Sequence, residues 1–411
     1  MASESAFTKF VALTRSRGWA AFCLALWLLG LGLSANAQEG TFVTFDAPGA
    51  GTGLYEGTYP FAINPAGVIT GFYQDGSNVY HGFLRVWDGT VIVFEVPGAG
   101  TGSGQGTIPL AISPAGAITG FYCDAVTCHG FLRARDGGFT PFDAPGAVNG
   151  TYAFSMDPAG AITGFYQDGS KVYHGFLRAR DGDFTTFDAP GAGSISFSGT
   201  QPRGINPSGT VAGCYLDANY SGHGFLRARD GTLASFDVPG QGTGVLKGIS
   251  CVMTYGIPNL FGKNPVLGIN PAEAITGSYY EPISGNWRGF LRAKDGSFTT
   301  FDAVPSPSSP SCTWTFPIAI NPAGTIAGYE NGIGGNHGFV RAADGAVTIL
   351  DAPGASMCPP SFNCINPGTV ADAINPAGQV VGFYSDDSSA NHGFLWIPRH
   401  HHGDAKVTSD E

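Results

Sequence analysis

Apolar residues occur along the chain in short runs that are separated by turn residues. The run at residues 68–73 follows Asn64-Pro65-Ala66-Gly67, where Asn, Pro and Gly suit the first, second and fourth positions of a turn. After a polar stretch come the pentapeptide His-Gly-Phe-Leu-Arg at residues 81–85, the tight turn Asp88-Gly89 and an apolar run at residues 91–94. Together with the residues before the first turn, this pattern predicts a unit of four short antiparallel β-strands.

The pentapeptide recurs along the chain, which makes the unit a repeat. Its second residue is a glycine in every copy, at positions 82, 130, 175, 224, 289, 338 and 393. The interval is about 45 to 55 residues, except for a longer one before Gly289. A period in this range is typical of propellers and solenoids. Seven units of four antiparallel strands predict an all-β fold, a seven-bladed β-propeller.

The two ends of the repeat region predict that the propeller closes into a ring. Residues 41–49, Thr-Phe-Val-Thr-Phe-Asp-Ala-Pro-Gly, match the fourth-strand segment at residues 184–191, yet they precede the first complete unit. The last unit ends at Trp396-Ile397-Pro398 without a fourth strand. We therefore expect the N-terminal strand to pair into the last blade, because this pairing removes two open sheet edges that would favour aggregation.

Two residues of the pentapeptide have predicted roles within the repeat. A strand glycine such as Gly82 commonly marks the close approach of a backbone or a ring. Six of the seven copies carry a histidine at the same position, whereas an active site needs one asymmetric arrangement. We expect each histidine to bond a nearby polar group, such as the Asp of Phe-Asp-Ala-Pro-Gly. We therefore assign no catalytic residue.

An acidic residue follows the second strand in each unit and borders the loops that vary most. The series is Asp75, Asp124, Asp168, Asp217, Glu281, Glu330 and Asp386. Such a ring could hold Ca²⁺, which takes several oxygen ligands. Asp is also an ordinary residue at the start of a hairpin loop, and we favour this interpretation. The sequence names no cofactor and predicts no metal site.

The first residues have the features of a secretory signal peptide. Basic residues precede an apolar run at residues 19–33, which is short for a membrane span and ends at Ala35-Asn36-Ala37. We predict a signal peptide at residues 1–37, the propeller at residues 38–397 and a flexible polar tail at residues 398–411. The mature protein is then secreted, to the periplasm or the exterior, and has no membrane span.

Composition agrees with an exported all-β protein and excludes one class of partner. Charged residues make up 12% of the chain, and 63 glycines and 28 prolines suit a fold with several turns in each unit. The formal net charge is -11 at pH 7. Nucleic acid is excluded, because binding it needs a basic surface. We expect a monomer with a glycan or protein ligand.

The cysteines suit an exported chain, in which disulfides can form. The candidate pairs are Cys123–Cys128 across a hairpin, Cys358–Cys364 within one insertion, and Cys251–Cys312 in successive insertions. Cys214 replaces the Phe of Gly-Phe-Tyr, so we expect a buried free thiol there. The spacing of the cysteines does not match a zinc site.

Departures from the repeat mark the candidate ligand site. The fifth unit replaces the pentapeptide histidine with Arg288, and the turn glycine with Glu273. Insertions at residues 241–265, 304–317 and 356–372 bring further aromatic residues. Aromatic side chains beside an acid and a cation suit stacking against a sugar or gripping a peptide. The candidate ligand-binding residues are Tyr255, Tyr280, Glu281, Trp287, Arg288 and Trp314.

The repeated text resembles a bacterial family of probable extracellular repeats that is named for the sequence His-Ala-Phe. The likeness rests on Ile-Asn-Pro-Ala-Gly before each pentapeptide and Asp-Gly-x-Phe-Thr-x-Phe-Asp after it, and it covers residues 41–397. The chain departs from the family in having Gly for the middle Ala, and Arg288 for one histidine. The resemblance implies export and a repeat fold and no particular reaction.

Three functions are open on this basis. No motif of a known enzyme class occurs, so the first hypothesis is a secreted, non-enzymatic binding or scaffold propeller. The alternative is a propeller enzyme, a polysaccharide lyase or hydrolase that uses unit-specific groups such as Glu281, Arg288 and His337. The third is a structural envelope protein. An enzyme should show a carboxylate or histidine with a shifted pKa inside the central funnel, and a binding protein an aromatic groove without one.

Overall fold

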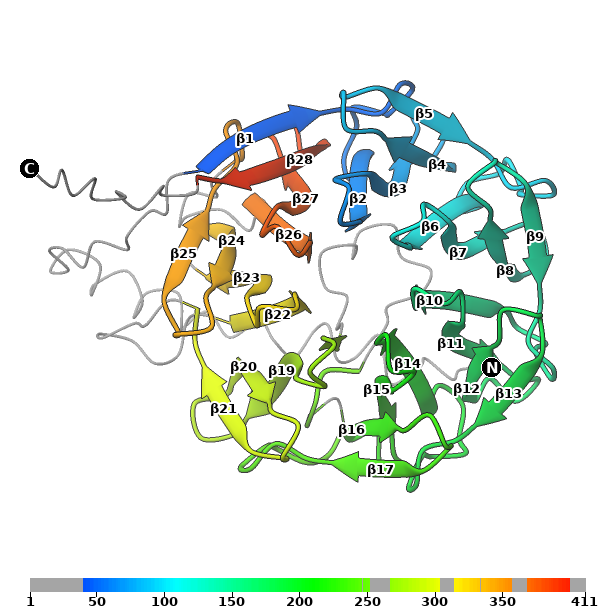
Figure 1. Cartoon of the computed structure of the whole chain (residues 1–411), viewed down its shortest axis with the longest axis vertical. Helices are drawn as coiled ribbons and strands as arrows, with labels where there is room; N and C mark the ends of the chain where they lie inside the picture. Colours follow the sequence, from blue (N-terminus) through cyan, green and yellow to red (C-terminus); the bar gives the residue numbers. More distant parts are fainter. Residues whose placement is uncertain are drawn as a thin grey trace, which may run out of the picture.

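The protein is built from β-strands throughout the part of the chain that is described. The computed structural model describes residues 40–245, 247–251, 267–303, 314–332, 334–356 and 368–399. Within these ranges every regular element is a strand, and no helix is present that could cross a membrane. The predicted all-β class is confirmed. The strands surround a central opening, and each unit runs from an inner strand to an outer one (Figure 1).

The strands follow the repeat of the sequence. The first three units contain β2 (Gly57–Ile63), β3 (Ile69–Gln74), β4 (Tyr80–Arg85) and β5 (Val91–Phe94); β6 (Gly106–Ile112), β7 (Ile118–Cys123), β8 (Cys128–Arg133) and β9 (Phe139–Phe142); and β10 (Thr151–Met156), β11 (Ile162–Gln167), β12 (Tyr173–Arg178) and β13 (Phe184–Phe187). The next three contain β14 (Gly199–Ile205), β15 (Val211–Leu216), β16 (Gly222–Arg227) and β17 (Leu233–Phe236); β18 (Gly268–Ile269), β19 (Ile275–Glu281), β20 (Asn286–Arg292) and β21 (Phe298–Phe301); and β22 (Trp314–Ile320), β23 (Ile326–Gly332), β24 (Gly335–Arg341) and β25 (Val347–Leu350). The last contains β26 (Gly368–Ile374), β27 (Val380–Ser385) and β28 (Asn391–Pro398), beside β1 (Gly40–Phe45).

Strands within a unit pair in antiparallel fashion, and neighbouring units meet through single parallel bridges. Tyr80 of the first unit bridges Gly106 of the second, and Asn391 of the last unit bridges Gly57 of the first. The ladders fall into three sheets, of 16, 8 and 4 strands. Most of the packing between units is therefore made by side chains rather than by backbone hydrogen bonds.

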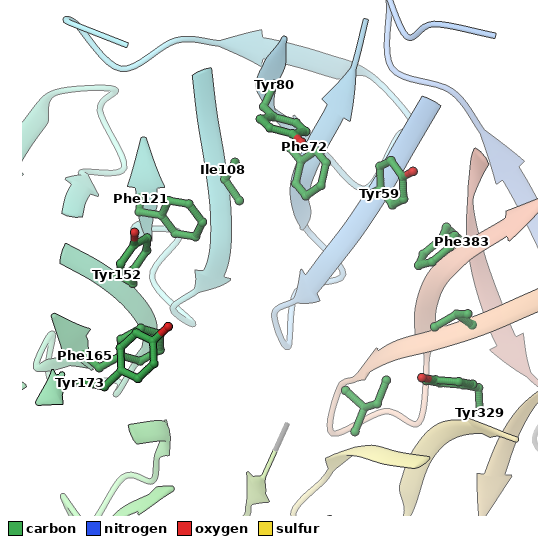
Figure 2. Packing of buried hydrophobic residues seen from close by; sticks show 12 residues of the cluster. Tyr59, Phe72, Tyr80, Ile108, Phe121, Tyr152, Phe165, Tyr173, Tyr329 and Phe383 are labelled. Atoms are coloured by element: carbon green, nitrogen blue, oxygen red, sulfur yellow. The ribbon is translucent and has the colours of Figure 1, made fainter. Parts of the chain in front are cut away.

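The apolar core lies between the units and around the opening. The phenylalanine of every pentapeptide is fully buried: Phe83, Phe131, Phe176, Phe225, Phe290, Phe339 and Phe394. An inner cluster of aromatic residues surrounds the opening and includes Tyr59, Phe72 and Phe383 (Figure 2). Burial of these rings between neighbouring units supplies most of the stabilisation, because apolar burial is the dominant favourable term in folding.

The pentapeptide glycine lies under a ring from the outer strand. A Cβ atom at Gly82 would lie 2.6 Å from the ring of Phe94, and one at Gly393 would lie 2.9 Å from the ring of Phe45. The same Phe45 ring lies under the guanidinium of Arg85 in the next unit, at 4.9 Å. The expected close approach of a ring to the glycine is thus present, and the ring also links two units.

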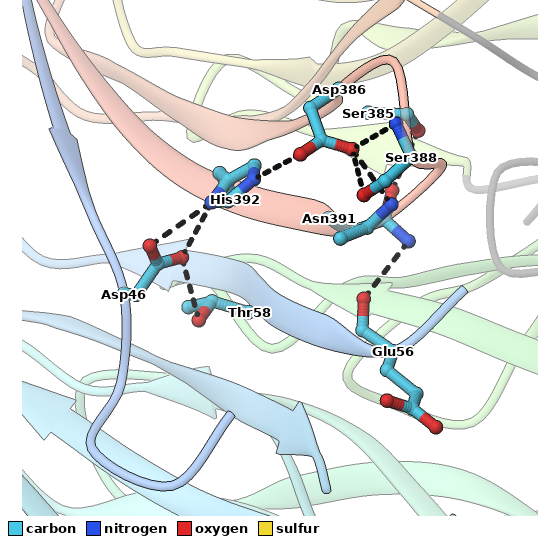
Figure 3. Close-up of polar contacts among 9 residues, drawn as sticks. Asp46, Glu56, Thr58, Ser385, Asp386, Ser388, Asn391 and His392 are labelled. Atoms are coloured by element: carbon cyan, nitrogen blue, oxygen red, sulfur yellow. Dashed lines mark hydrogen bonds and ion pairs between the residues drawn. The ribbon is translucent and has the colours of Figure 1, made fainter. Parts of the chain in front are cut away.

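The first strand pairs with the last unit. In the antiparallel register of β1 and β28, Gly40 lies opposite Pro398 and Phe45 lies opposite Gly393. Nδ1 of His392 lies 3.0 Å from both carboxylate oxygens of Asp46 (Figure 3). This is the predicted bond between the pentapeptide histidine and the acid that follows the outer strand.

One predicted insertion lies elsewhere in the fold. Gly248 bridges Gly222, and Ile249 bridges Tyr279, which places residues 248–249 at the start of the inner strand of the fifth unit. The short strand β18 forms the end of that inner strand. In the sequence, residues 252–266 separate these two parts of the strand, whereas we expected an insertion between units at residues 241–265.

The disulfides confirm one predicted pair and correct two other assignments. Cys123 and Cys128 are joined across their hairpin as predicted. Cys214 is joined to Cys251, so neither the free thiol at Cys214 nor the pair Cys251–Cys312 is correct. The reason is that Cys214 faces the interrupted inner strand of the next unit, where Cys251 lies in the same buried cluster. Cys312, Cys358 and Cys364 lie outside the described residues, as do the predicted signal peptide and residues 400–411.

Removal of the first strand tests its contribution to the fold. Deletion of residues 38–47 takes away β1, uncovers Gly393 and Arg85, and leaves β28 as an open edge. We expect a sharply lower thermal midpoint and aggregation, measured by calorimetry and light scattering against a control that lacks only residues 400–411. An unchanged midpoint would contradict the structural role of β1.

Candidate functional site

A bulge in the inner strand places one residue of each unit at the central opening. The ladder between the first and second strands shifts register after Pro60, and equivalent shifts occur in the other units whose ladders are long enough. A bulge leaves one residue unpaired and bends the strand. The bulged residues are Phe61, Leu110, Phe154, Arg203, Ile318 and Asp372, and Leu267 holds the same place before β18.

These bulged residues line a cavity of about 240 Å³. Five of the seven side chains are apolar, which agrees with a wall that repeats from unit to unit. The two departures are Arg203 on β14 and Asp372 on β26, and these strands lie on opposite sides of the opening (Figure 1). A largely apolar cavity with a few polar groups is the usual form of a small-molecule site.

Asp372 is the acid of this cavity. Burial raises the pKa of Asp372 well above its usual value, because the surroundings disfavour the charged form. Its Oδ2 atom has no hydrogen-bond partner among the described residues. A raised pKa favours the protonated form of the carboxyl group, and the unpartnered oxygen is available to a ligand in the cavity.

Tyr329 on β23 is a second unpartnered polar group beside Asp372. It stands where the first unit has the apolar ring of Phe72, and its side chain is 1% exposed. Its hydroxyl has no hydrogen-bond partner in the described part of the chain. Burial raises the pKa of Tyr329, and the charge of Asp372 adds to the effect. Figure 2 shows its hydroxyl pointing toward the middle of the ring of units.

Arg203 is held against the wall of the cavity. Its Nη2 atom donates to Oε1 of Gln201 at 2.6 Å, and its guanidinium lies over the rings of Phe154 and Phe165 at 4.7 and 5.3 Å. These contacts fix a positive charge with low mobility at the edge of the apolar lining. The cavity therefore has one buried cation and one carboxyl group whose pKa is raised.

The residues that we predicted as a ligand site form a separate aromatic row. Tyr280 and Trp287 meet edge to face at 5.8 Å, and Trp287 lies 6.4 Å from Phe316 on the next unit. Lys247 lies over the ring of Tyr280 at 5.5 Å. Trp314 begins β22 and is half-buried. Tyr255 lies outside the described residues, so a depression that contains all of the predicted residues stays a prediction.

The charged members of the predicted site are already bound within the protein. Nε and Nη2 of Arg288 donate to the two carboxylate oxygens of Asp302 at 2.9 and 2.8 Å. Glu281 accepts from the backbone of Ile283 and from Ser284 in its own hairpin. Neither residue lines the central cavity. Their contacts are those of a structural pair and a turn.

The hairpins show the roles of two residues, Asp75 and Glu330, in the predicted series of acids. Asp75 accepts from the backbone of Ser77 and Val79 at 2.8 and 2.9 Å, which is the expected turn geometry. Glu330 does not belong to this series, because it pairs with His337 at the position that Tyr73 occupies opposite His81. Among the described residues, no group of three His, Cys, Asp or Glu side chains could hold a metal ion.

Sequence reasoning missed Asp372 and Tyr329. The available signal was the alignment of the units, in which five units have Phe, Leu or Ile at the position of Asp372, and four have Phe at the position of Tyr329. The bulge hid this signal, because strict alternation along the inner strand does not show which residue faces the opening.

Comparison with solved structures identifies the class of fold. The chain is similar to a streptogramin B lyase, with 15% identity, a TM-score of 0.52, and coverage of 88% of this chain and 99% of that one. It is also similar to a catalytically inactive virginiamycin B lyase from Staphylococcus aureus crystallised with quinupristin, with 12% identity, a TM-score of 0.50, and coverage of 87% and 100%. A third is the β-propeller domain of the Trilobed protease from Pyrococcus furiosus, with 9% identity, a TM-score of 0.52, and coverage of 83% and 97%. No family model matches the chain, and no curated protein matches it.

These neighbours show that the chain is a β-propeller, and they correct our first hypothesis of function. A non-enzymatic binding or scaffold protein was the main expectation, whereas the neighbours include lyases and part of a protease. At these low identities the likeness shows the fold alone, so the chemistry has to be argued from the cavity.

Replacement of Asp372 tests whether its carboxyl group is a cost to the fold. Asp372→Leu should raise stability by about 1–3 kcal/mol, the cost of an unpartnered buried polar group, because leucine matches the lining at Leu110. The raised folded pKa means that wild-type stability falls as pH rises above the ordinary value of 3.8, so the gain should widen from pH 4 to 8. Thermal midpoints at several pH values measure it, and Asp136→Asn at an exposed turn is the control. A loss of stability at all pH values would contradict the assignment.

Proposed function

We propose that this protein is a propeller enzyme, a lyase or hydrolase, in which Asp372 is the proton donor of the central cavity. The observation that carries the proposal is the setting of Asp372: a raised pKa, an oxygen without a partner, and a place in a largely apolar cavity. This combination supports an enzyme over a binding propeller, because groups with perturbed pKa values cluster at catalytic sites.

The chemistry follows from the state of the carboxyl group. A general acid has to hold its proton at the working pH, and burial gives Asp372 this property. The protonated carboxyl can donate to the oxygen of a leaving group as the bond to that oxygen breaks. The apolar lining excludes water and so strengthens the interactions made inside the cavity. Tyr329 is close enough for Asp372 to raise its pKa, and it supplies a hydroxyl group near the carboxyl group.

The lining supports a polysaccharide as the substrate. Phe61 and Phe154 offer rings against which the apolar face of a sugar can stack. A cavity of about 240 Å³ accepts one ring-sized group rather than a whole chain, so a terminal sugar is the expected occupant. Arg203 supplies a positive charge at the rim for an acidic or hydroxyl-rich sugar.

The finer architecture belongs to the same proposal. We infer a ring of seven blades in which β1 completes the last one, supported by the bridge between Asn391 and Gly57 and by a hydrogen bond from Asn375 Nδ2 to the carbonyl of Asn64 at 3.3 Å. The disulfides Cys123–Cys128 and Cys214–Cys251 support export to an oxidising compartment, with residues 1–37 as the signal peptide. Kinship with the extracellular repeat family stays a proposal as well.

A substrate screen with matched variants tests the proposed function. The mature protein is incubated with acidic and neutral polysaccharides, and the products are followed by new reducing ends for hydrolysis and by unsaturated sugars for elimination. We expect activity on at least one polymer, and a loss of about 10² to 10⁴-fold in Asp372→Asn, the usual contribution of a general acid. Asp136→Asn serves as the control with full activity.

Two outcomes would contradict the proposal at different points. Absence of activity on every polymer would reject polysaccharides as the substrate class. Full activity of Asp372→Asn on a polymer that the wild type degrades would reject Asp372 as the proton donor, and would move the catalytic site outside the central cavity.

A further inference from the structure

The histidine of the sixth unit differs from the histidines of the other units. In five units the ring is held on both sides: Nδ1 faces the acid after the outer strand, and Nε2 lies 3.3 to 3.6 Å from the hairpin acid. In the sixth unit Nδ1 of His337 lies 2.8 Å from Oδ1 of Asp351. Its Nε2 atom has no acidic partner among the residues that the structure describes.

The hairpin of the sixth unit explains the missing acid. In the first unit Asp75 follows Gln74 at the end of the second strand. In the sixth unit Gly332 follows Asn331 at that point, and Gly332 pairs directly with Gly335 in a tighter hairpin. Gly334 and Gly335 adopt φ values of 110° and 123°, which only glycine takes without strain. Gly332 therefore stands at the position of the hairpin acid that lies near Nε2 in the other units.

The same unit replaces the tyrosine that stacks on the histidine. Tyr73 lies against His81 at a centroid distance of 4.7 Å, and four other units repeat this stack. In the sixth unit the residue opposite His337 is Glu330. Glu330 is 6% exposed, and its Oε2 atom has no partner among the described residues. Burial raises the pKa of Glu330, and the positive charge of His337 opposes that effect.

The electrostatics of the three residues favour proton transfer at His337. The hydrogen bond to Asp351 raises the pKa of His337 most, and the charges of Asp351 and Glu330 raise it further against the effect of burial. A carboxylate on Nδ1 fixes the ring orientation and the tautomer and stabilises the imidazolium. This arrangement leaves Nε2 as a base whose conjugate acid is supported by two carboxyl groups.

We propose that His337, oriented by Asp351 and supported by Glu330, is a second catalytic site that hydrolyses acyl esters. Glu330 and His337 lie side by side on neighbouring strands, so they can approach a substrate from one side only. Displacement at a sugar carbon with inversion needs groups on opposite sides of the bond. Acyl transfer needs one group that takes a proton from the attacking nucleophile and then gives a proton to the leaving group. A single histidine can fill both roles.

The reaction balances with water as the only co-substrate. Nε2 of His337 takes a proton from water while the water oxygen forms a bond to the carbonyl carbon of the ester. The tetrahedral intermediate then breaks its bond to the alkoxide oxygen, which takes the proton from Nε2. The products are one carboxylic acid and one alcohol. His337 is the catalytic residue, and Glu330 and Asp351 are positioning residues.

This site does not depend on the proposed function of the central cavity. Tyr329 and Glu330 are consecutive on β23, so their side chains point to opposite faces of the strand. Tyr329 faces the side of Asp372, whereas Glu330 faces His337. Ester hydrolysis and polysaccharide cleavage can therefore be present or absent independently.

Hydrolysis of p-nitrophenyl acetate by the mature protein tests the proposal. The rate above buffer should rise with pH through a midpoint above 6.5, because the base acts in its neutral form and its pKa is raised. His337→Gln should lower this rate by about 100-fold. His174→Gln is the matched control, because His174 has a carboxylate on each side and should contribute nothing.

Variants of Glu330 distinguish a functional role from a structural one. Glu330→Gln should move the midpoint of the pH profile to lower pH, because one of the groups that raise the pKa of His337 is removed. Glu330→Tyr restores the residue of the other units and should keep the thermal midpoint while lowering the rate. Equal rates for the wild type and His337→Gln, or equal losses in His337→Gln and His174→Gln, would overturn the proposal.

Discussion

A single aromatic contact connects most units to the next, and the exception is the sixth unit, where Leu350 stands at this position. The ring of Phe45 covers the pentapeptide glycine of the last unit, Gly393, and lies under Arg85 of the first. The rings of Phe94 and Phe142 do the same for the units that follow. One side chain thus fills a space in its own sheet and binds a cation from the neighbouring sheet. No unit can bury its faces alone, so stability depends on neighbouring units.

This dependence constrains where chemistry can reside. Residues that are identical in every unit are committed to packing or to bonds such as that between His392 and Asp46. Residues that depart from the repeat are not required for packing between units. Two of them, Asp372 and Glu330, are carboxyl groups whose pKa values are raised. Glu330 stands where the other units have tyrosine, and Asp372 stands where five of them have an apolar side chain. Burying an unpartnered carboxyl group costs stability, and a rigid propeller can carry this cost at a few positions.

Much of the scaffold could be predicted from the sequence, because its signals are local and repeated. The strands, the ring over the pentapeptide glycine, the histidine–acid bond and the Cys123–Cys128 disulfide all follow from patterns a few residues long. The errors arose where the chain departs from the regular period. We did not predict Asp372 because the bulge shifts the alternation of the inner strand by one residue. We placed Glu330 in the series of acids because the hairpin of the sixth unit is shorter than those of the other units. The interruption of the fifth inner strand hid the partner of Cys214.

The central claim is that burial in the cavity raises the pKa of Asp372 well above its ordinary value and so favours the protonated carboxyl group. Its most direct test is a titration of the side-chain carboxyl carbon of Asp372 by NMR, with ¹³C-labelled aspartate and Asp372→Asn to assign the signal. The account predicts a midpoint well above the ordinary 3.8, shifted further by any ligand that fills the cavity. A signal that titrates near 3.8 would show an ionised carboxylate at neutral pH and would contradict the account.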